Sequence, residues 1–383
     1  MLPYEQPNQC CGCGACVSLC PVGALSLQEN ADGFLYPVCE ETLCTQCGLC
    51  RSRCGLTKPV ENSVLAVYAA TEMDHEQLQQ STSGGIFAAI ATLVLEQGGL
   101  VFGATLDHNL EPIHRSIRTL EQLPLLQGSK YVQSAIGSTY EEAAQALTVG
   151  RTVLFSGTPC QIAGLYGFLG NQPKKTLLTL DLICHGVPHG KFFRDYKAWL
   201  TESANAPMVG FKFRDKSAGW GLTGKVTYQM PDGSLQDQIL SGDDCSYYDL
   251  FLHGEFYRES CFACPYACKH RPADITVGDF WGIDSIHPEW MSPQGGPFDP
   301  RRGISSIILN SENGIAWFRQ LEPRLISKQA TFEEAAHRNK QLTESPRRSP
   351  AQDAVRALYH SGGYEAINQY ALDRLAKEGP IKP

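Results

Sequence analysis

"CCGCGACVSLCP", at residues 10–21, is the stretch that decides how the N-terminal part of this chain folds. Its cysteines have the spacing C-x2-C-x2-C-x3-C, and Pro21 follows the fourth of them. A second stretch, "CTQCGLCRSRCG" at residues 44–55, repeats that spacing and has Gly55 in place of the proline. The repetition indicates two matched sets of metal-binding thiolates.

This spacing resembles that of bacterial ferredoxins, in which the fourth cysteine of each run ligates the cluster of the other run. Structural zinc is the alternative, but a zinc site has no use for four cysteines in one run, twice. The pattern therefore predicts two 4Fe–4S clusters. Their ligands are Cys10, Cys13, Cys16 and Cys54 for the first, and Cys44, Cys47, Cys50 and Cys20 for the second. Cys11 and Cys39 lie outside the pattern and are interpreted as small buried thiols or free surface cysteines.

The segment between the two runs has the alternation and turn residues of a short hairpin. We expect residues 1–60 to form a ferredoxin-like module, whose last residues overlap a linker at residues 55–63 that leads to the body of the chain. A module of this size cannot bury a large core, so the clusters themselves are expected to hold it together. By itself it predicts one-electron transfer and says nothing about a substrate.

Ten of the 16 cysteines fall in residues 10–54. The first residues show no export signal, so a reducing compartment with metal or redox chemistry is favoured over disulfides, and we expect a cytoplasmic protein. The net charge of −8 comes without a basic block, which argues against nucleic acid or an anionic membrane as the main partner. No apolar run approaches ~20 residues, so no transmembrane segment is expected.

The body of the chain is predicted to be α/β, and α+β when the whole chain is considered. A strand is expected at 64–70, and residues 81–107 read as a polar turn, an apolar helix, a Gly-Gly stop and a strand. A glycine-rich turn that opens a helix suits a phosphate. An ordinary serine N-cap on a core helix explains the same residues, and the residues alone favour it.

Residues 151–169 repeat the strand–turn–helix arrangement, and 176–188 add another buried strand. Cys160 and Cys184 follow these two strands, and ligands gather at the carboxyl ends of strands in open α/β sheets. Residues 211–238 alternate like antiparallel strands, with "PDGS" as a hairpin turn. The predicted parts are 64–145 and 146–330 for the two portions of the main domain, and 331–383 for a polar helical tail.

Single candidate residues have ordinary structural explanations as well. His185 could donate a proton, although a hydrogen-bonded structural histidine explains it equally well. Lys130 could contact a phosphate or a flavin edge, or be a solvated lysine. Trp220 and Trp281 are more often core aromatics than cofactor stackers. The usual motifs of nucleotide-binding folds, zinc proteases and serine hydrolases are missing from the sequence.

Seven motifs in order resemble the beta subunits of deazaflavin-reducing hydrogenases and dehydrogenases, a family that includes 7-hydroxymethyl chlorophyll a reductase. They span residues from about 64 to 320. The motifs are "STSGGIF" (81–87), "GSKYVQS" (128–134), "SGTPCQIAGL" (156–165), "DLICHGVP" (181–188), "FRDKSAGWG" (213–221), "SCFACPYACKHRPADITVGDFWG" (260–282) and "RRGISSIILNSENG" (301–314). The resemblance implies an FAD-binding α/β flavoprotein domain behind the ferredoxin-like module.

The resemblance also implies where the cofactors bind. The implied FAD contacts are Ser83, Gly84, Gly85, Ser129, Lys130, Tyr131, Ser134, Gly157 and Thr158, and this lifts the phosphate interpretation of the turn above the N-cap interpretation. A third 4Fe–4S cluster is implied in the flavoprotein domain. Its assigned ligands are Cys160, Cys184, Cys261 and Cys264. Cys268 is the surplus thiol and the alternate ligand.

Three hypotheses follow for the function. The first is an oxidoreductase that moves electrons between a ferredoxin-type partner and a two-electron small-molecule substrate at FAD, with a deazaflavin coenzyme as one candidate and His185 as a candidate proton donor. The second is an electron-transfer subunit of a hydrogenase or dehydrogenase without a substrate of its own. The third is a cysteine-rich zinc or interaction module, which the flavoprotein motifs disfavour.

Overall fold

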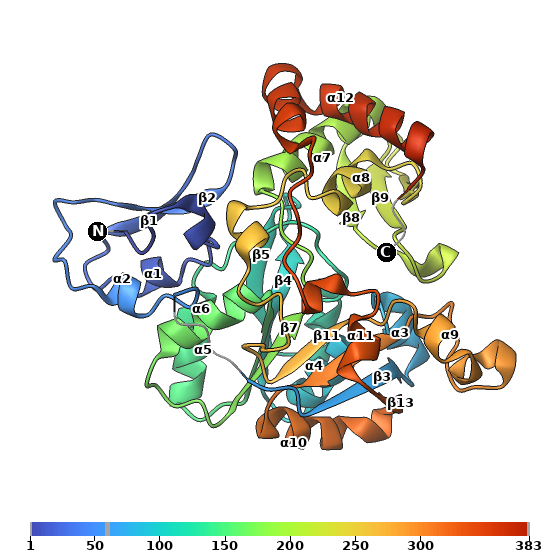
Figure 1. Cartoon of the computed structure of the whole chain (residues 1–383), viewed down its shortest axis with the longest axis horizontal. Coiled ribbons are helices and arrows are strands. Elements are labelled where there is room, and N and C mark those ends of the chain that lie inside the picture. Colours follow the sequence, from blue (N-terminus) through green and yellow to red (C-terminus); the bar gives the residue numbers. More distant parts are fainter. Residues whose placement is uncertain (1, 58–61, 381–383) are drawn as a thin grey trace.

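The computed structural model describes residues 2–57 and 62–380. It shows three parts: a small N-terminal module, a central mixed sheet with helices on its faces, and a lobe built on a second, antiparallel sheet (Figure 1). Residues 58–61, which belong to the predicted linker, lie outside the described residues. Within the described ranges, no helix is both long enough and apolar enough to cross a bilayer.

The N-terminal module consists of a hairpin and two short helices. Strands β1 (Leu25–Glu29) and β2 (Leu35–Cys39) pair antiparallel, which confirms the predicted hairpin. Helices α1 (Ala15–Ser18) and α2 (Leu49–Ser52) lie inside the two cysteine runs. Each begins directly after a glycine with positive φ, 76° at Gly14 and 74° at Gly48. The repeated spacing therefore folds into the same local backbone twice.

The central sheet has eight strands in the order β13-β3-β12-β11-β7-β6-β4-β5. The four inner strands β11, β7, β6 and β4 run parallel, and the others pair antiparallel with their neighbours. The bounds are β3 Ala66–Glu72, β4 Leu100–Leu106, β5 Pro112–Ile117, β6 Val153–Gly157, β7 Leu177–Leu182, β11 Ile275–Asp279, β12 Ser305–Leu309 and β13 Leu325–Ala330. Both predicted portions of the main domain thus contribute strands to one sheet.

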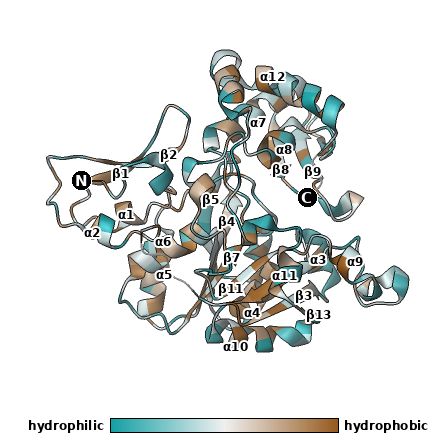
Figure 2. Ribbon diagram, in the orientation of Figure 1, coloured by the Kyte–Doolittle hydropathy of each residue, from teal (hydrophilic) through white to brown (hydrophobic). Residues whose placement is uncertain are grey.

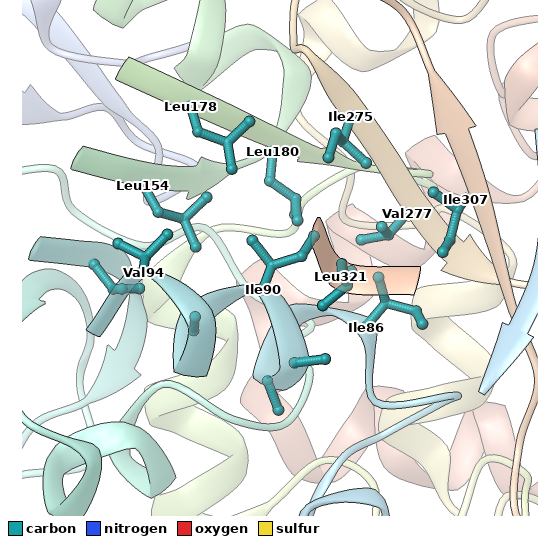
Figure 3. Close-up of a cluster of buried hydrophobic side chains, with 14 of the residues drawn as sticks. Ile86, Ile90, Val94, Leu154, Leu178, Leu180, Ile275, Val277, Ile307 and Leu321 are labelled. Carbon is teal, nitrogen blue, oxygen red and sulfur yellow. The ribbon is translucent and has the colours of Figure 1, made fainter. Parts of the chain in front are cut away.

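Alternate residues of the parallel strands face opposite layers of helices. Leu154, Leu178 and Leu180 pack against α4 (Ile86–Glu96) and α10 (Glu312–Leu321). Figure 3 shows these leucines pointing toward Ile86, Ile90 and Val94 of α4. Figure 2 shows that α4 and the strands near it are the most hydrophobic part of the ribbon. The apolar helix that was predicted within residues 81–107 is present as α4. Its apolar side chains fill this core.

The opposite face of the sheet is covered by α5 (Thr139–Thr148) and α6 (Pro159–Leu169). Phe102 and Phe155 point to this side, with ring centroids 5.4 Å apart. Ala15 of α1 belongs to the same cluster of buried side chains. The module is therefore packed onto the helical layer of the main domain and shares its core.

The third part is a lobe with an aromatic core. Its sheet has the order β10-β9-β8, which confirms the antiparallel strands predicted at 211–238. The elements are β8 Met208–Lys212, β9 Gly224–Gln229, β10 Leu235–Leu240, α7 Gly190–Ala204, α8 Ser246–Leu252 and α12 Gln352–Glu378. Helix α12 buries Tyr359, Tyr364 and Ile367 against this core. The predicted helical tail thus closes the lobe.

Three short helices complete the fold around the central sheet. They are α3 His75–Gln80, α9 Ile283–Ile286 and α11 Phe332–Ala336. Ile283 and Ala335 bury their side chains with Phe298 and Ile308, at the end of the sheet that β13 and β3 form.

The contact between the module and α6 depends on glycines. A Cβ atom at Gly55 would lie 2.7 Å from the carbonyl oxygen of Ala163, and one at Gly167 would overlap the carbonyl oxygen of Arg53. A Cβ atom at Gly164 would lie 2.9 Å from Cys13 Sγ. Backbone atoms of the module therefore lie directly against backbone atoms of α6 along this contact.

Gly167→Ala tests this contact. In a free helix the change would stabilise by about 1 kcal/mol, because alanine is the better helix former. Here we expect the opposite sign, a loss of about 1–3 kcal/mol from overpacking against Arg53. Thermal unfolding checks it. Gly221→Ala is the control, since a Cβ atom there meets nothing within 4 Å, and a Gly167→Ala protein that melts higher than wild type would contradict the contact.

Candidate functional site

The first cysteine set combines thiols from both runs. The pKa of Cys16 is raised to about 12, first by burial and then by the neighbouring thiols of Cys10, Cys54 and Cys50. Burial also raises the pKa of Cys10, and Cys54 acts in the same direction. Cys54, the last cysteine of the second run, thus lies among the thiols of the first run, as crossed ligation requires. The position of Cys54 supports the first predicted ligand set.

The second set surrounds a small hollow on the module. Its lining includes Cys20 together with Cys44, Cys47 and Cys50. Cys39 also lines it, and its thiol is hydrogen-bonded to that of Cys44. The fourth cysteine of the first run therefore faces the second run, which supports the second predicted set.

The third set comes from three separate segments of the main domain. Cys160 is the second residue of α6, Cys184 follows β7, and Cys261 and Cys264 lie at a 3₁₀ turn, Glu259–Ala263. The pKa values of Cys184 and Cys264 are raised to about 12 and about 11, in both cases by burial first and then by the thiol of Cys160. Burial likewise raises the pKa of Cys261, with Cys184 as the next cause. The four thiols, each on a half-buried residue, form one group.

Cys268 differs from these four. Its sulfur donates to the carbonyl oxygens of Pro265 at 3.3 Å and His270 at 3.4 Å. The Cys268 thiol therefore points back into the loop that carries it. This supports the choice of Cys264 over Cys268 as the fourth ligand.

Across residues 2–57 and 62–380, no group of three or more His, Cys, Asp or Glu side chains is drawn closely enough together to hold a single metal ion. A single zinc ion needs its sulfur ligands about 2.3 Å from one centre. A 4Fe–4S cube instead takes one thiolate at each of four irons.

A cavity of about 270 Å³ lies at the carboxyl ends of the parallel strands. Gly157, Leu182 and Asp279, at the ends of β6, β7 and β11, border it. The expectation that a ligand site forms at this edge is therefore matched by the geometry. The predicted site residues that line the cavity are Ser83, Gly85, Ser129, Lys130, Tyr131, Ser134, Gly157, Thr158, Cys160, Cys184 and His185.

Gly84 is the predicted FAD contact that does not line the cavity. Its N–H donates to Ser305 Oγ at 2.9 Å, and a Cβ atom there would overlap the carbonyl oxygen of Ala70. Glycine is needed at this position so that the turn can approach β3 and β12. The neighbouring Gly85, with φ 81°, starts α4 at the edge of the cavity.

Two lysines border the glycine turn without a carboxylate partner among the described residues. Lys130 Nζ donates to the carbonyl oxygens of Leu126 at 3.1 Å and Gln127 at 2.9 Å, and burial lowers its pKa to about 7. Lys216 Nζ donates to the carbonyl of Ser83 at 2.5 Å, and burial lowers its pKa to about 7 as well. Ammonium groups withdrawn from solvent with only neutral partners suit an anionic ligand.

The polar wall of the cavity contains a histidine that the sequence did not single out. His114 Nδ1 lies 2.8 Å from Ser134 Oγ, and Nε2 lies 3.0 Å from the carbonyl oxygen of Ser156. Because a carbonyl can only accept, Nε2 carries the proton and Nδ1 accepts from the serine. Burial lowers the pKa of His114 to about 4, so the ring is neutral. The sequence did not predict His114, because a single histidine in an edge strand is not part of a motif.

His185 is also neutral. Gln341 Nε2 donates to its Nδ1 at 2.8 Å, and burial lowers its pKa to about 4. The proton therefore lies on Nε2. Nearby, Asp279 accepts from Arg214 and from Trp220 Nε1, both at 2.6 Å, and Trp220 stacks on Trp281 with centroids 4.6 Å apart. A role for His185 as proton donor stays a prediction.

Cys264→Ala and Cys268→Ala form a matched pair of variants. We expect Cys264→Ala to lose iron from the third set, since one corner of the cube has no ligand. Cys268→Ala should keep the wild-type iron content. Iron and sulfide determination on anaerobically purified protein measures both, and a loss of a cluster's iron from Cys268→Ala alone would reverse the assignment.

Comparisons with known proteins agree with this arrangement. Residues 150–334 match the family described as the C terminus of the beta subunit of coenzyme F420 hydrogenase/dehydrogenase, and residues 9–56 match the 4Fe-4S dicluster domain. The chain is 24% identical over 194 residues to the F subunit of the F(420)H(2) dehydrogenase of Methanosarcina mazei, which covers 47% of this chain and 54% of that protein. It is 27% identical over 199 residues to an uncharacterized protein of Methanocaldococcus jannaschii, covering 43% and 54%.

The chain thus spans about half the length of the curated relatives it matches. Among solved structures, the xenon-derivatized F420-reducing NiFe hydrogenase complex from Methanosarcina barkeri aligns over 85% of this chain and 98% of that chain, with 17% identity and a TM-score of 0.45. A likeness at this level adds nothing to the assignment. The family matches confirm the resemblance seen in the motifs. Residues 150–334 thus resemble the C-terminal part of coenzyme F420 hydrogenase/dehydrogenase beta subunits, and they follow a match to the 4Fe-4S dicluster domain at residues 9–56.

Proposed function

We propose that this protein is an FAD- and iron–sulfur-dependent oxidoreductase with three 4Fe–4S clusters. It exchanges electrons with a ferredoxin-type or hydrogenase/dehydrogenase partner and with a two-electron small-molecule substrate, for which a deazaflavin coenzyme is the first candidate. The dicluster domain and the beta-subunit match make it an iron–sulfur electron-transfer protein related to F420 hydrogenases and dehydrogenases. FAD, the third cluster and the substrate are the proposed additions.

One observation carries the proposal: Cys160 and Cys184 of the third set line the same cavity as the residues expected to contact FAD. When bound, FAD supplies two-electron chemistry and each cluster supplies one-electron chemistry. Two of the proposed thiolate ligands and most of the proposed flavin contacts would then border one cavity. No other segment of the chain would be needed to bring the third cluster and FAD together.

The chain's own residues would bind the cofactor through its phosphates. Ser129 N–H donates to Thr82 Oγ1 at 2.8 Å, so the turn that precedes α4 and the 128–134 segment are held to each other. The ammonium of Lys130 lies on the second of these segments. Together with the start of α4 at Ile86 it provides positive charge for an anion. His185 also lines the cavity, and its Nε2–H would donate to a substrate there.

The alternative is an electron-transfer subunit with no substrate of its own. It is favoured by the exposure of Val22 and Leu43, 43% and 52%, at the edge of the second cysteine set. Exposed apolar side chains beside a redox site suit contact with another protein. Anaerobic reduction of a deazaflavin by the purified chain with bound flavin separates the two functions: turnover supports the enzyme, and its absence with full cofactor content supports the subunit.

Cofactor content is the direct test of the proposal. We expect iron and sulfide for three clusters and one FAD per chain after anaerobic purification. Lys130→Met should weaken FAD binding about tenfold or more, because a hydrogen bond or ion contact to a charged group contributes roughly 1.5–3 kcal/mol. Titration of flavin into the flavin-free protein measures this.

Lys328→Met is the control for that measurement, since Lys328 is exposed on β13 and is not among the residues that line the cavity. Flavin that binds equally to wild type and Lys130→Met would place the phosphates elsewhere. Zinc in place of iron, with no flavin, would overturn the proposal as a whole.

A further inference from the structure

The junction between the module and the main domain is built around one arginine. Arg258 is 0% exposed, and its guanidinium donates three hydrogen bonds. The acceptors are Cys10 O at 2.8 Å, Gln133 Oε1 at 3.1 Å and Leu35 O at 2.5 Å. The guanidinium also lies over the Tyr36 ring, 4.2 Å from its centroid. Each of these partners is uncharged.

No carboxylate in the described part of the chain forms an ion pair with Arg258. The adjacent acid, Glu259, is instead paired with Arg348 and Arg356. A fully buried cation with only neutral partners is costly unless an anion lies near it. A 4Fe–4S cluster held by four thiolates is such an anion.

Arg258 is bonded to a ligand of each of two proposed clusters. Its side chain reaches Cys10 of the first set, and its backbone carbonyl accepts from Cys261 N–H of the third set at 2.9 Å. Arg258 therefore contacts a ligand residue of the first set through its side chain and one of the third set through its backbone.

A second observation puts the same two sets side by side. The buried thiol of Cys11 lies next to the thiols of Cys13 of the first set and Cys160 of the third. Its backbone carbonyl accepts from Gln133 Nε2 at 2.8 Å. The hollow at the second set, by contrast, is lined, within the described part of the chain, by module residues between Cys20 and Cys50. One thiol separates the first set from the third.

On the basis of the proposed function, we infer that the first cluster, held by Cys10, Cys13, Cys16 and Cys54, is the one that exchanges electrons with the third cluster. Arg258 is the positioning residue that joins the two clusters and supplies positive charge to both. The exchange moves one electron from one cluster to the other. No bond forms or breaks, and no proton is transferred. The second cluster is then left at the outer end of the module.

Gly12 shows that the backbone is fitted to this arginine. It has φ +66°, and a Cβ atom there would lie 2.8 Å from the guanidinium carbon of Arg258. Any other residue would be strained and would displace the side chain. The first cysteine run thus contains a glycine whose position admits the buried cation.

Redox titration monitored by electron paramagnetic resonance tests the charge. In full-length, anaerobically purified Arg258→Met with wild-type iron content, we expect the equilibrium constant for reducing the first or third cluster to fall about tenfold, which is about 59 mV for one electron. Arg258→Lys keeps the charge and should shift much less. Arg194→Met is the control, because Arg194 also joins the two parts, to Glu29 at 2.6 Å, but on the surface.

A second variant keeps the arginine in place. Gln133→Glu sets a carboxylate against the guanidinium and should lower the same potential even if Arg258→Met does not fold. Unchanged potentials in whichever of these variants retains full iron would overturn the role of Arg258. Missing iron or flavin in the wild type would instead overturn the proposed function.

The order of the clusters has its own readout. In the fully reduced protein, the electron paramagnetic resonance signal of the third cluster should be broadened by magnetic interaction with the first cluster, which lies next to it. Cys16→Ser, which alters the first cluster, should change that broadening, and Cys47→Ser, which alters the second, should leave it as it is. The reverse pattern would show that the second cluster is the neighbour.

Discussion

The ion pair between Asp181 and Arg271 connects the sheet, the cysteine loop and the module. Both side chains are out of solvent, at 0% and 1% exposure, and their charged atoms are 3.1 Å apart. Arg271 also donates to the carbonyl of Tyr266 at 2.6 Å, and Tyr266 Oη donates to the carbonyl of Gly55 at 2.7 Å. Removing one member would leave a buried charge unpaired, which costs about 3–5 kcal/mol. The loop that carries Cys261 and Cys264 is held in place by this chain of contacts.

The parallel strands then determine what the loop meets. Because β6 and β7 run side by side in the same direction, the residues that follow them, Cys160 and Cys184, come out at the same edge. β11 begins after the loop and returns alongside β7. Residues separated by about a hundred positions in the sequence are thereby combined into one group of thiols. The cavity lies at that same edge because the strand ends leave space between the helical layers.

The sequence was informative where the spacing of residues is local. The two cysteine runs, the hairpin between them and the strand–turn–helix units at β6 and α6 all rest on contacts within about 20 residues, and the structure contains them. The third set needed the family resemblance, since its members come from three segments. Arg258 could not be predicted, because a lone arginine three residues before Cys261 carries no pattern, and its burial depends on the module packing against it.

The glycines between the module and α6 have a consequence for electron tunnelling. Tunnelling rates fall steeply with the distance between redox centres. Where Gly55 and Gly167 let main chain touch main chain, that distance is determined by backbone atoms, which move less than long side chains do. The proposed transfer between the first and the third cluster would then take place over a spacing that the fold determines, and thermal motion of the surface would leave its rate nearly constant.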